Sequence, residues 1–405
     1  MSIHWVNNIM ACRGKGPSWL TEEATASVRR FHRTVPEYRM TPLVSLPDMA
    51  RRLGVGGLYI KDESQRFGLN AFKALGGVYA VSRAAAEALG WKGKQISFSE
   101  LMGEDVRQRL ASMVFVTATD GNHGRGVAWA AGLLGCRTVV YMPRGSSPLR
   151  AAAIRQAGEA DVMITDLSYD DAVRKAAADA KAHGWHLIQD TAWPGYERVP
   201  QWIVEGYSTM VWEALLQMGE YGAAPTHVFL QAGVGAMAGS AAGYLANAMG
   251  EWKPLMTTVE PVEAACLYES VKAADGKPHA ATGSGKTIMA GLNCGEPCML
   301  TWPILRDEIS WAVAATNDVA ARGMRLLAAP RGGDGQIISG ESGAATMGVL
   351  SCIMEDPALE ALRENMRLDR NASVLLFNTE GDTDPAVWRR AVYDGAWPYK
   401  REDRS

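Results

Sequence analysis

The chain has 405 residues, of which 47% are hydrophobic and 21% charged, and its formal net charge is −3. This length predicts two domains or lobes, and the near-neutral charge gives no reason to expect nucleic acid or a membrane surface as a partner. Apolar runs are too short for a membrane-spanning helix and no apolar signal segment is visible at the start, so we expect a cytoplasmic protein.

Short apolar segments rich in β-branched residues alternate with alanine-rich helical segments. The predicted strands are 57–63, 113–119, 137–142, 161–165, 185–190, 226–232, 254–261 and 372–380, and the predicted helices include 125–134, 148–158, 169–183, 237–249 and 312–327. Apolar strands that alternate with helices are typical of α/β proteins with parallel sheets. We therefore predict an α/β fold with two lobes of parallel sheet flanked by helices. The larger domain comprises 1–84 and 196–405, and the smaller inserted domain comprises 85–195 and carries Asp120 and Asn122.

Polar or glycine residues follow four of the predicted strands directly. These strand ends read "TATDGNHG" (117–124), "QDTAWPGY" (189–196), "QAGVGAMAG" (231–239) and "FNTEGDTD" (377–384). Ligands of open α/β sheets bind at the carboxyl ends of the strands. Four such ends in one chain predict a binding site between the lobes.

Lys73 is the first candidate for a chemical role. Most lysines are solvated surface groups, but Lys73 lies in "NAFKALGG" (70–77) among apolar and small residues. Burial there would lower the pKa of its amine and free it for imine chemistry. Gly76 and Gly77 would let another part of the molecule or a ligand approach closely.

The segment "FLQAGVGAMAGSAAG" (229–243) predicts a strand, a glycine turn and a helix of small residues. Backbone N–H groups at such a helix N-terminus bind phosphate. The spacing also satisfies the dinucleotide fingerprint G-x-G-x-x-A at 233–238, with Glu260 placed to bind a ribose. A nicotinamide dehydrogenase, another phosphate ligand and a tight turn without a ligand all remain open on this motif alone.

Asp120 and Asn122 lie between a predicted strand and a predicted helix. A helix cap is the ordinary role for either residue, and a carboxylate and an amide at the mouth of a site are the chemical alternative. His123 is interpreted as structural. Glu341 and Ser342 precede another helix of small residues, as a cap would.

The six cysteines are scattered and predict reduced thiols. Cys294 and Cys298 are four residues apart, but no second pair completes a zinc site. The seven histidines show no metalloenzyme spacing, so we expect no metal.

Together these motifs resemble the fold type II pyridoxal-phosphate enzymes, the group of threonine dehydratase and tryptophan synthase β. The resemblance implies pyridoxal 5'-phosphate as cofactor, with Lys73 as the Schiff-base lysine, Asn122 at the phenolic oxygen of the cofactor and Thr379 at its pyridine nitrogen. It also places Phe72 and the phosphate loop Gly233, Val234, Gly235, Ala236 and Met237 among the cofactor-binding residues.

Two departures separate the chain from threonine dehydratases. Those enzymes typically read S-F-K-x-R-G-A at the lysine, where this chain has "NAFKALGG", and they carry Ser or Ala where this chain has Asp120. The segments "RFGLNAFKALGG", "TDGNHGRGVAW", "QDTAWPGY" and "NTEGDTDP" are instead similar to the diaminopropionate ammonia-lyase family.

That resemblance implies a homodimeric lyase that converts 2,3-diaminopropionate to pyruvate and two ammonia molecules. Lys73 would take the α-proton of the L isomer and Asp120 that of the D isomer, while Thr119, Asp120 and Asp190 would contact the substrate. A serine or threonine dehydratase is the alternative, and a nicotinamide dehydrogenase is the more remote one.

Overall fold

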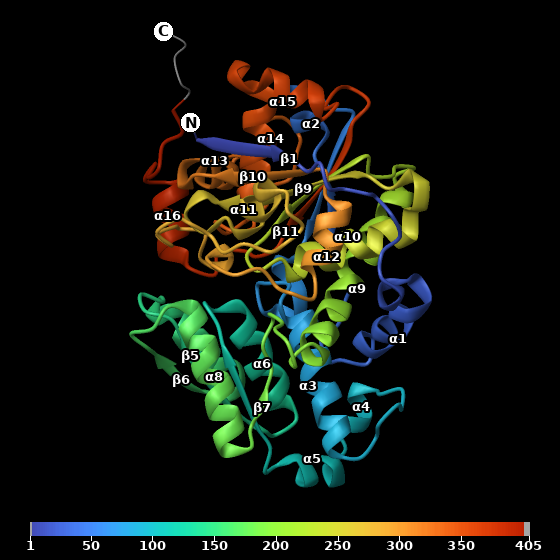
Figure 1. Ribbon diagram of the computed structural model, residues 1–405, viewed down its shortest axis with the longest axis vertical. Coiled ribbons are helices and arrows are strands. Elements are labelled where there is room, and N and C mark those ends of the chain that lie inside the picture. The colour runs from blue at the N-terminus through green and yellow to red at the C-terminus, as the bar shows by residue number, and fades with distance from the viewer. Residues whose placement is uncertain (1, 401–405) are drawn as a thin grey trace.

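Two β-sheets organise the structure, a computed structural model in which residues 2–400 are described (Figure 1). The larger sheet has seven strands in the order β1-β10-β9-β8-β11-β3-β2. Its five central strands run parallel, and the edge strands β1 and β2 pair antiparallel to their neighbours. The strands are β1 (Ile3–Asn7), β2 (Leu43–Ser45), β3 (Gly57–Asp62), β8 (His227–Gln231), β9 (Leu255–Pro261), β10 (Trp311–Ala315) and β11 (Ser373–Asn378).

The smaller sheet has four parallel strands in the order β6-β5-β4-β7. They are β4 (Val114–Ala118), β5 (Arg137–Met142), β6 (Asp161–Ile164) and β7 (His186–Leu187), and all lie inside the segment 85–195. In Figure 1 this lobe is the green and teal part below the larger sheet. The α/β fold with two lobes of largely parallel sheet is therefore as predicted.

Helices flank the two sheets. They are α1 (Glu22–His32), α2 (Pro47–Leu53), α3 (Ala74–Ala88), α4 (Phe98–Leu101), α5 (Glu104–Leu110), α6 (Asn122–Leu133), α7 (Pro148–Gly158), α8 (Tyr169–His183), α9 (Arg198–Glu220), α10 (Ala236–Met249), α11 (Cys266–Ala273), α12 (Trp302–Glu308), α13 (Asn317–Ala328), α14 (Ala345–Glu355), α15 (Glu360–Asn365) and α16 (Pro385–Val392). Short 3₁₀ turns lie at Ser18–Leu20, Glu63–Gly68, Gly250–Trp252, Val262–Ala264, Ala290–Leu292 and Pro357–Leu359. Within residues 2–400, no helix is long and apolar enough to cross a membrane.

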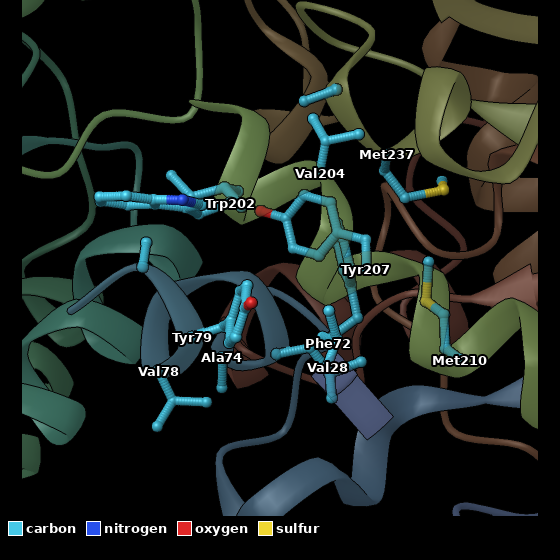
Figure 2. Packing of buried hydrophobic residues seen from close by; sticks show 14 of the residues in the cluster. Val28, Phe72, Ala74, Val78, Tyr79, Trp202, Val204, Tyr207, Met210 and Met237 are labelled. Atoms are coloured by element: carbon cyan, nitrogen blue, oxygen red, sulfur yellow. The ribbon is translucent and has the colours of Figure 1, made fainter. Parts of the chain in front are cut away.

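Glycines allow helix α3 to pack tightly against α9 and α6. A Cβ on Gly76 would lie 2.7 Å from the ring of Tyr207, and one on Gly126 would lie 2.8 Å from Cα of Ala74. The close approach predicted at Gly76 and Gly77 is thus the approach of helices α9 and α6 to α3. Figure 2 shows the same core, where the rings of Phe72 and Tyr207 lie 4.8 Å apart. This packing fixes the backbone directly after Lys73.

The predicted helix at 312–327 starts too early. Residues Trp311–Ala315 form strand β10, and the helix α13 begins at Asn317. The sequence "WAVAA" is rich in alanine, but all five residues are buried between β1 and β9, and this tertiary pairing overrides the helical propensity. Strand β7 is also shorter than the predicted 185–190, and the edge strands β1 and β2 were not predicted.

Candidate active site

One cavity is lined by residues from all four polar strand ends, between the two lobes. It brings together predicted residues that are up to 307 positions apart in the sequence: Phe72, Lys73, Asn122, Asp190, Gly233, Val234, Gly235, Ala236, Met237 and Thr379. The strands end on the same side of each sheet because they are parallel. Their loops therefore meet where the lobes face one another.

Lys73 and Asp190 form an ion pair at the cavity wall. The Nζ of Lys73 donates to Oδ2 of Asp190 at 2.9 Å, and the side chains are 15% and 4% exposed. Lys73 lies directly before α3, and Asp190 follows β7 of the other lobe. The pair thus joins the lobes at the cavity.

The predicted lowering of the Lys73 pKa is wrong for this arrangement. Burial does act to lower the pKa of Lys73, but the negative charges of Asp190 and Asp120 outweigh it and hold the pKa well above its usual value. The partner carboxylates come from a distant part of the chain. Local apolar neighbours therefore could not predict the direction of the shift.

Asp190 is held as a carboxylate by several groups. Burial acts to raise its pKa, but the Lys73 ammonium outweighs burial and holds the pKa of Asp190 well below its usual range. Its Oδ1 accepts hydrogen bonds from the Tyr169 hydroxyl and the Gln189 amide, both at 3.2 Å. His123 Nε2 donates to the carbonyl of Ile188 at 2.8 Å, which suits the structural role predicted for it.

The glycine turn after β8 presents a row of free backbone donors at the N-terminus of α10. Among the described residues, the N–H groups of 233–237 find no hydrogen-bond acceptor. Gly235 has φ +93°, and a Cβ there would lie 2.8 Å from Leu305 Cδ1. The turn therefore fits a phosphate, which would satisfy these donors.

Thr379 lines the cavity directly after the end of β11. Gln231 Nε2 donates to Thr379 Oγ1 at 2.9 Å and to the carbonyl of Phe377 at 2.7 Å. The Thr379 hydroxyl accepts one bond and keeps its own proton to donate. The N–H of Phe72 donates to the Thr379 carbonyl at 3.0 Å, which ties the Lys73 segment to this end.

Asn122 contacts the larger lobe through Glu380. Its Nδ2 donates to Glu380 Oε2 at 2.6 Å, and Oε1 of the same carboxylate accepts from the N–H of Ser342 at 3.1 Å. The start of α6 is thereby fixed to two loops of the larger lobe.

Asp120 is not the cap of helix α6. Thr119 Oγ1 accepts the N–H groups of Gly121 and Gly124, at 2.9 and 3.0 Å, and so performs the capping that an Asp would perform. The Thr119 side chain is buried in this cap. A contact of its hydroxyl with a substrate stays a prediction.

The Asp120 carboxyl group instead faces a wider cleft that it lines with Tyr169, Arg150 and Glu341. Its side chain is 15% exposed, and within the described part of the chain Oδ2 accepts no hydrogen bond. Burial raises the pKa of Asp120, and the positive charges of Lys73 and Arg150 offset only part of that rise. A carboxyl group with a raised pKa is a stronger base than one in water.

Glu260 does not serve a ribose. Its side chain is fully buried and accepts the N–H groups of Leu267 and Tyr268 at 2.8 and 2.7 Å, which caps helix α11. Glu260 is absent from the walls of the cavity. A nicotinamide dehydrogenase would need Glu260 to bind the ribose of its cofactor, and Glu260 is not available for that role.

The family of the chain follows from its likeness to known proteins. A model of the family described as "Pyridoxal-phosphate dependent enzyme" matches residues 35–368. The diaminopropionate ammonia-lyase of Salmonella typhimurium strain LT2 is 50% identical over 384 residues, which cover 94% of this chain and 95% of that protein. This chain belongs to the diaminopropionate ammonia-lyase family.

Solved structures of a diaminopropionate ammonia-lyase share the fold. The Escherichia coli enzyme in complex with D-serine aligns with a TM-score of 0.91 at 43% identity, over 98% of each chain. The same enzyme in complex with an aminoacrylate-PLP azomethine reaction intermediate aligns with a TM-score of 0.90, also at 43% identity and over 98% of each chain. By contrast, the L-threonine dehydratase of Pasteurella multocida is 26% identical over 273 residues, 67% of this chain and 44% of that protein.

Several residues of this ammonia-lyase cavity were not predicted from the sequence. They are Tyr169, Tyr207, Gln231, Gly291, Cys294, Ser342 and Glu380. Ser342 precedes a predicted helix and Glu380 ends the predicted strand 372–380, and this position was the only signal that could have found them. Tyr169 and Tyr207 belong to helices and carried no local signal. Among residues 2–400 no group of side chains could hold a metal ion, and the six cysteines are free thiols.

Proposed function

We propose that the protein eliminates ammonia from both the L and the D isomer of 2,3-diaminopropionate. One water is consumed, and pyruvate and two ammonia molecules are released. The observation that carries the proposal is that a buried carboxylate, Asp190, lies in the cavity that bears Lys73, and a partly buried carboxyl group, Asp120, lies beside it. A substrate with two amino groups needs both an anion for its second ammonium and a base for its α-proton.

The residues that line the cavity fit pyridoxal 5'-phosphate. Lys73 would carry the cofactor through Nζ, the N–H groups of 233–237 would bind its phosphate, and Phe72 would pack beside its ring. Asn122 would bind its phenolic oxygen and Thr379 its pyridine nitrogen. When bound, pyridoxal phosphate supplies an electron sink for the bond that breaks at the α-carbon. The Thr379 hydroxyl cannot stabilise a charged pyridinium as a carboxylate would, which favours rapid β-elimination.

Two bases from different lobes would serve the two isomers. Lys73 would remove the α-proton of the L isomer and Asp120 that of the D isomer, because the α-protons of the two isomers point in opposite directions. The support is that Asp120 is neither a helix cap nor bonded to Lys73. Its partial burial raises its pKa toward the range where a base is effective.

Asp190 would bind the β-ammonium group of the substrate. In the structure it already accepts an ammonium, that of Lys73, at 2.9 Å. An amine leaves only when protonated, so a carboxylate that holds it as an ammonium assists the elimination. Thr119 is the remaining proposed contact with the substrate.

The experiment is a substrate comparison on the purified protein. We expect a visible absorption band that borohydride abolishes, and pyruvate release from L- and D-diaminopropionate that exceeds keto-acid release from L-serine and L-threonine. Faster release from L-threonine than from either diaminopropionate isomer would make the protein a dehydratase. If the band is absent, the glycine turn would bind a ligand other than pyridoxal phosphate.

Three further inferences belong with this function. The protein would form homodimers and work in the cytoplasm, and the segment 85–195 would be its smaller domain. Sedimentation equilibrium of the purified protein measures the first, and a mass near twice 43.7 kDa is the expected result.

A further inference from the structure

Arg150 lies against the loop that carries Asp120. It belongs to helix α7 and its side chain is only 6% exposed. A Cβ built on Gly121 would lie 3.1 Å from Cδ of Arg150, so the arginine stem occupies the place that a side chain at 121 would fill. Gly121 is the residue between Asp120 and Asn122, so the stem packs on this loop directly.

The guanidinium group lies between two acids. Its Nη2 donates to Glu341 Oε1 at 2.5 Å and to Thr383 Oγ1 at 3.4 Å, while Nη1 is 3.9 Å from Asp120 Oδ2. A separation of 3.9 Å is too long for a hydrogen bond but close enough for a strong charge interaction at a partly buried site. Among the described residues, Asp120 Oδ2 and Arg150 Nε have no hydrogen-bond partner.

The arginine also connects the lobes. Arg150 comes from the smaller lobe, whereas Glu341 and Thr383 come from loops of the larger lobe. Asp120 also belongs to the smaller lobe, so Arg150 and Asp120 face one another within one lobe, and the contacts with Glu341 and Thr383 tie them to the larger lobe. The ion pair with Glu341 holds the guanidinium in that place.

We propose that Arg150, anchored by Glu341, is the positioning residue that fixes the orientation and the charge state of Asp120. The inference rests on the proposed role of Asp120 as a base. Arg150 does not transfer a proton itself, because its own charge is permanent. The Glu341 carboxylate partly neutralises the arginine charge that acts on Asp120. Arg150 therefore lowers the pKa of Asp120, and Glu341 raises it.

The charged groups that face Asp120 and Arg150 define in which direction the pKa of Asp120 should shift in each variant. Asp120 interacts with Lys73, Arg150, Glu380 and Asp190, and Arg150 interacts with Glu341, Glu380 and Asp120. Loss of the arginine charge removes one cation and would raise the pKa of Asp120. Burial raises the pKa of Glu341 to about 7, so its charge is present above that pH. There, loss of the Glu341 charge leaves the arginine less compensated and would lower the pKa of Asp120.

The test compares Arg150→Met with Glu341→Gln in the pH dependence of kcat/KM for D-diaminopropionate. The acid limb of this profile reports the ionisation of the base in the free enzyme. We expect Arg150→Met to move the limb to higher pH by about one unit, which lowers the D-isomer rate on the acid side of the limb by up to about tenfold. Glu341→Gln should move the limb to lower pH. Arg150→Lys keeps the charge and should restore most of the wild-type limb.

The L isomer is the internal control, and its pH profile should keep its acid limb in all three variants.

A second measurement does not depend on turnover. The carboxyl band of Asp120 is isolated by infrared difference between the wild type and Asp120→Asn. Its titration midpoint should rise in Arg150→Met and fall in Glu341→Gln. Limbs that stay in place, or that move in the same direction in both variants, overturn the inference.

A failure of the proposed function can be distinguished from a failure of the positioning role of Arg150. If Asp120→Asn itself leaves D-isomer turnover unchanged, then Asp120 is not the base. If Asp120→Asn abolishes that turnover and the Arg150 variants leave the limb unmoved, only the positioning role is lost.

Discussion

The Nζ of Lys73 lies 2.9 Å from Oδ2 of Asp190, so the lysine proposed to carry the cofactor begins as one half of an ion pair. Because the ion pair outweighs burial, the pKa of Lys73 lies above its ordinary value, and the amine is protonated at neutral pH. A protonated amine cannot attack an aldehyde. Asp190 would therefore slow attachment of the cofactor, in addition to its proposed role as the partner of the substrate's β-ammonium group.

Asp190→Asn should separate these two effects. Without the carboxylate, the pKa of Lys73 should fall, so attachment of pyridoxal phosphate to cofactor-free protein should become faster at neutral pH and shift its pH dependence downward. Turnover should fall, because the β-ammonium loses its partner. Stopped-flow absorbance between pH 6 and 9 measures attachment. Asp170→Asn is the matched control, since Asp170 is half-buried in the wider cleft beside the cavity and does not contact Lys73.

Lys73→Ala should abolish turnover but retain the cofactor without a covalent bond. The free N–H groups of 233–237 would still bind the phosphate. Borohydride followed by mass spectrometry should find the cofactor on Lys73 in the wild type, and on no lysine in the variant. The exposed Lys94→Ala serves as control and should behave as the wild type. Label on a different lysine of the wild type would remove Lys73 from its proposed role.

Gly235→Asp should lower the affinity for pyridoxal phosphate sharply. At φ +93° any side chain is strained, and its Cβ would press on Leu305. The carboxylate adds a negative charge where the phosphate would bind. Gly235→Ala carries the same strain without the charge, so the difference between the two dissociation constants measures the charge alone. Equal affinities in a folded Asp variant would indicate a turn without a phosphate.

Thr119→Val should destabilise the protein where Asp120→Asn does not. The Thr119 hydroxyl accepts two N–H groups at the start of α6, and the loss of such a cap costs about 1 kcal/mol. We expect a lower melting temperature for Thr119→Val, and nearly unchanged values for Thr119→Ser and Asp120→Asn. A drop in the Asp120→Asn variant of the same size would assign a structural role to the aspartate.

Much of the architecture could be predicted because it depends on local patterns. The strands of the smaller sheet and the glycine turn at 233–237 follow from short-range signals in the sequence. Parallel strands bring their ends together, so the site between the lobes followed from the strand ends.

The remaining errors concern partners that are distant in the sequence. The local sequence predicts a lowered pKa for Lys73, because Asp190, its ion-pair partner, is 117 residues away in the sequence. A second ambiguity was local: Thr119 and Asp120 are adjacent and either could cap α6, and the backbone of the turn makes Thr119 the cap. Residues 311–315 resemble a helix locally and become a strand only between two others. Side-chain partners and edge pairings depend on the whole fold.

Turnover of the two isomers of diaminopropionate by Asp120→Asn is the most direct test of the catalytic account. The substitution keeps the shape of the side chain and removes the base. We expect D-isomer turnover to fall by about two orders of magnitude or more, the usual contribution of a general base. L-isomer turnover should fall less, because Lys73 serves it. Near-normal rates for both isomers would contradict the role of Asp120 and leave the carboxylate without a part in the reaction.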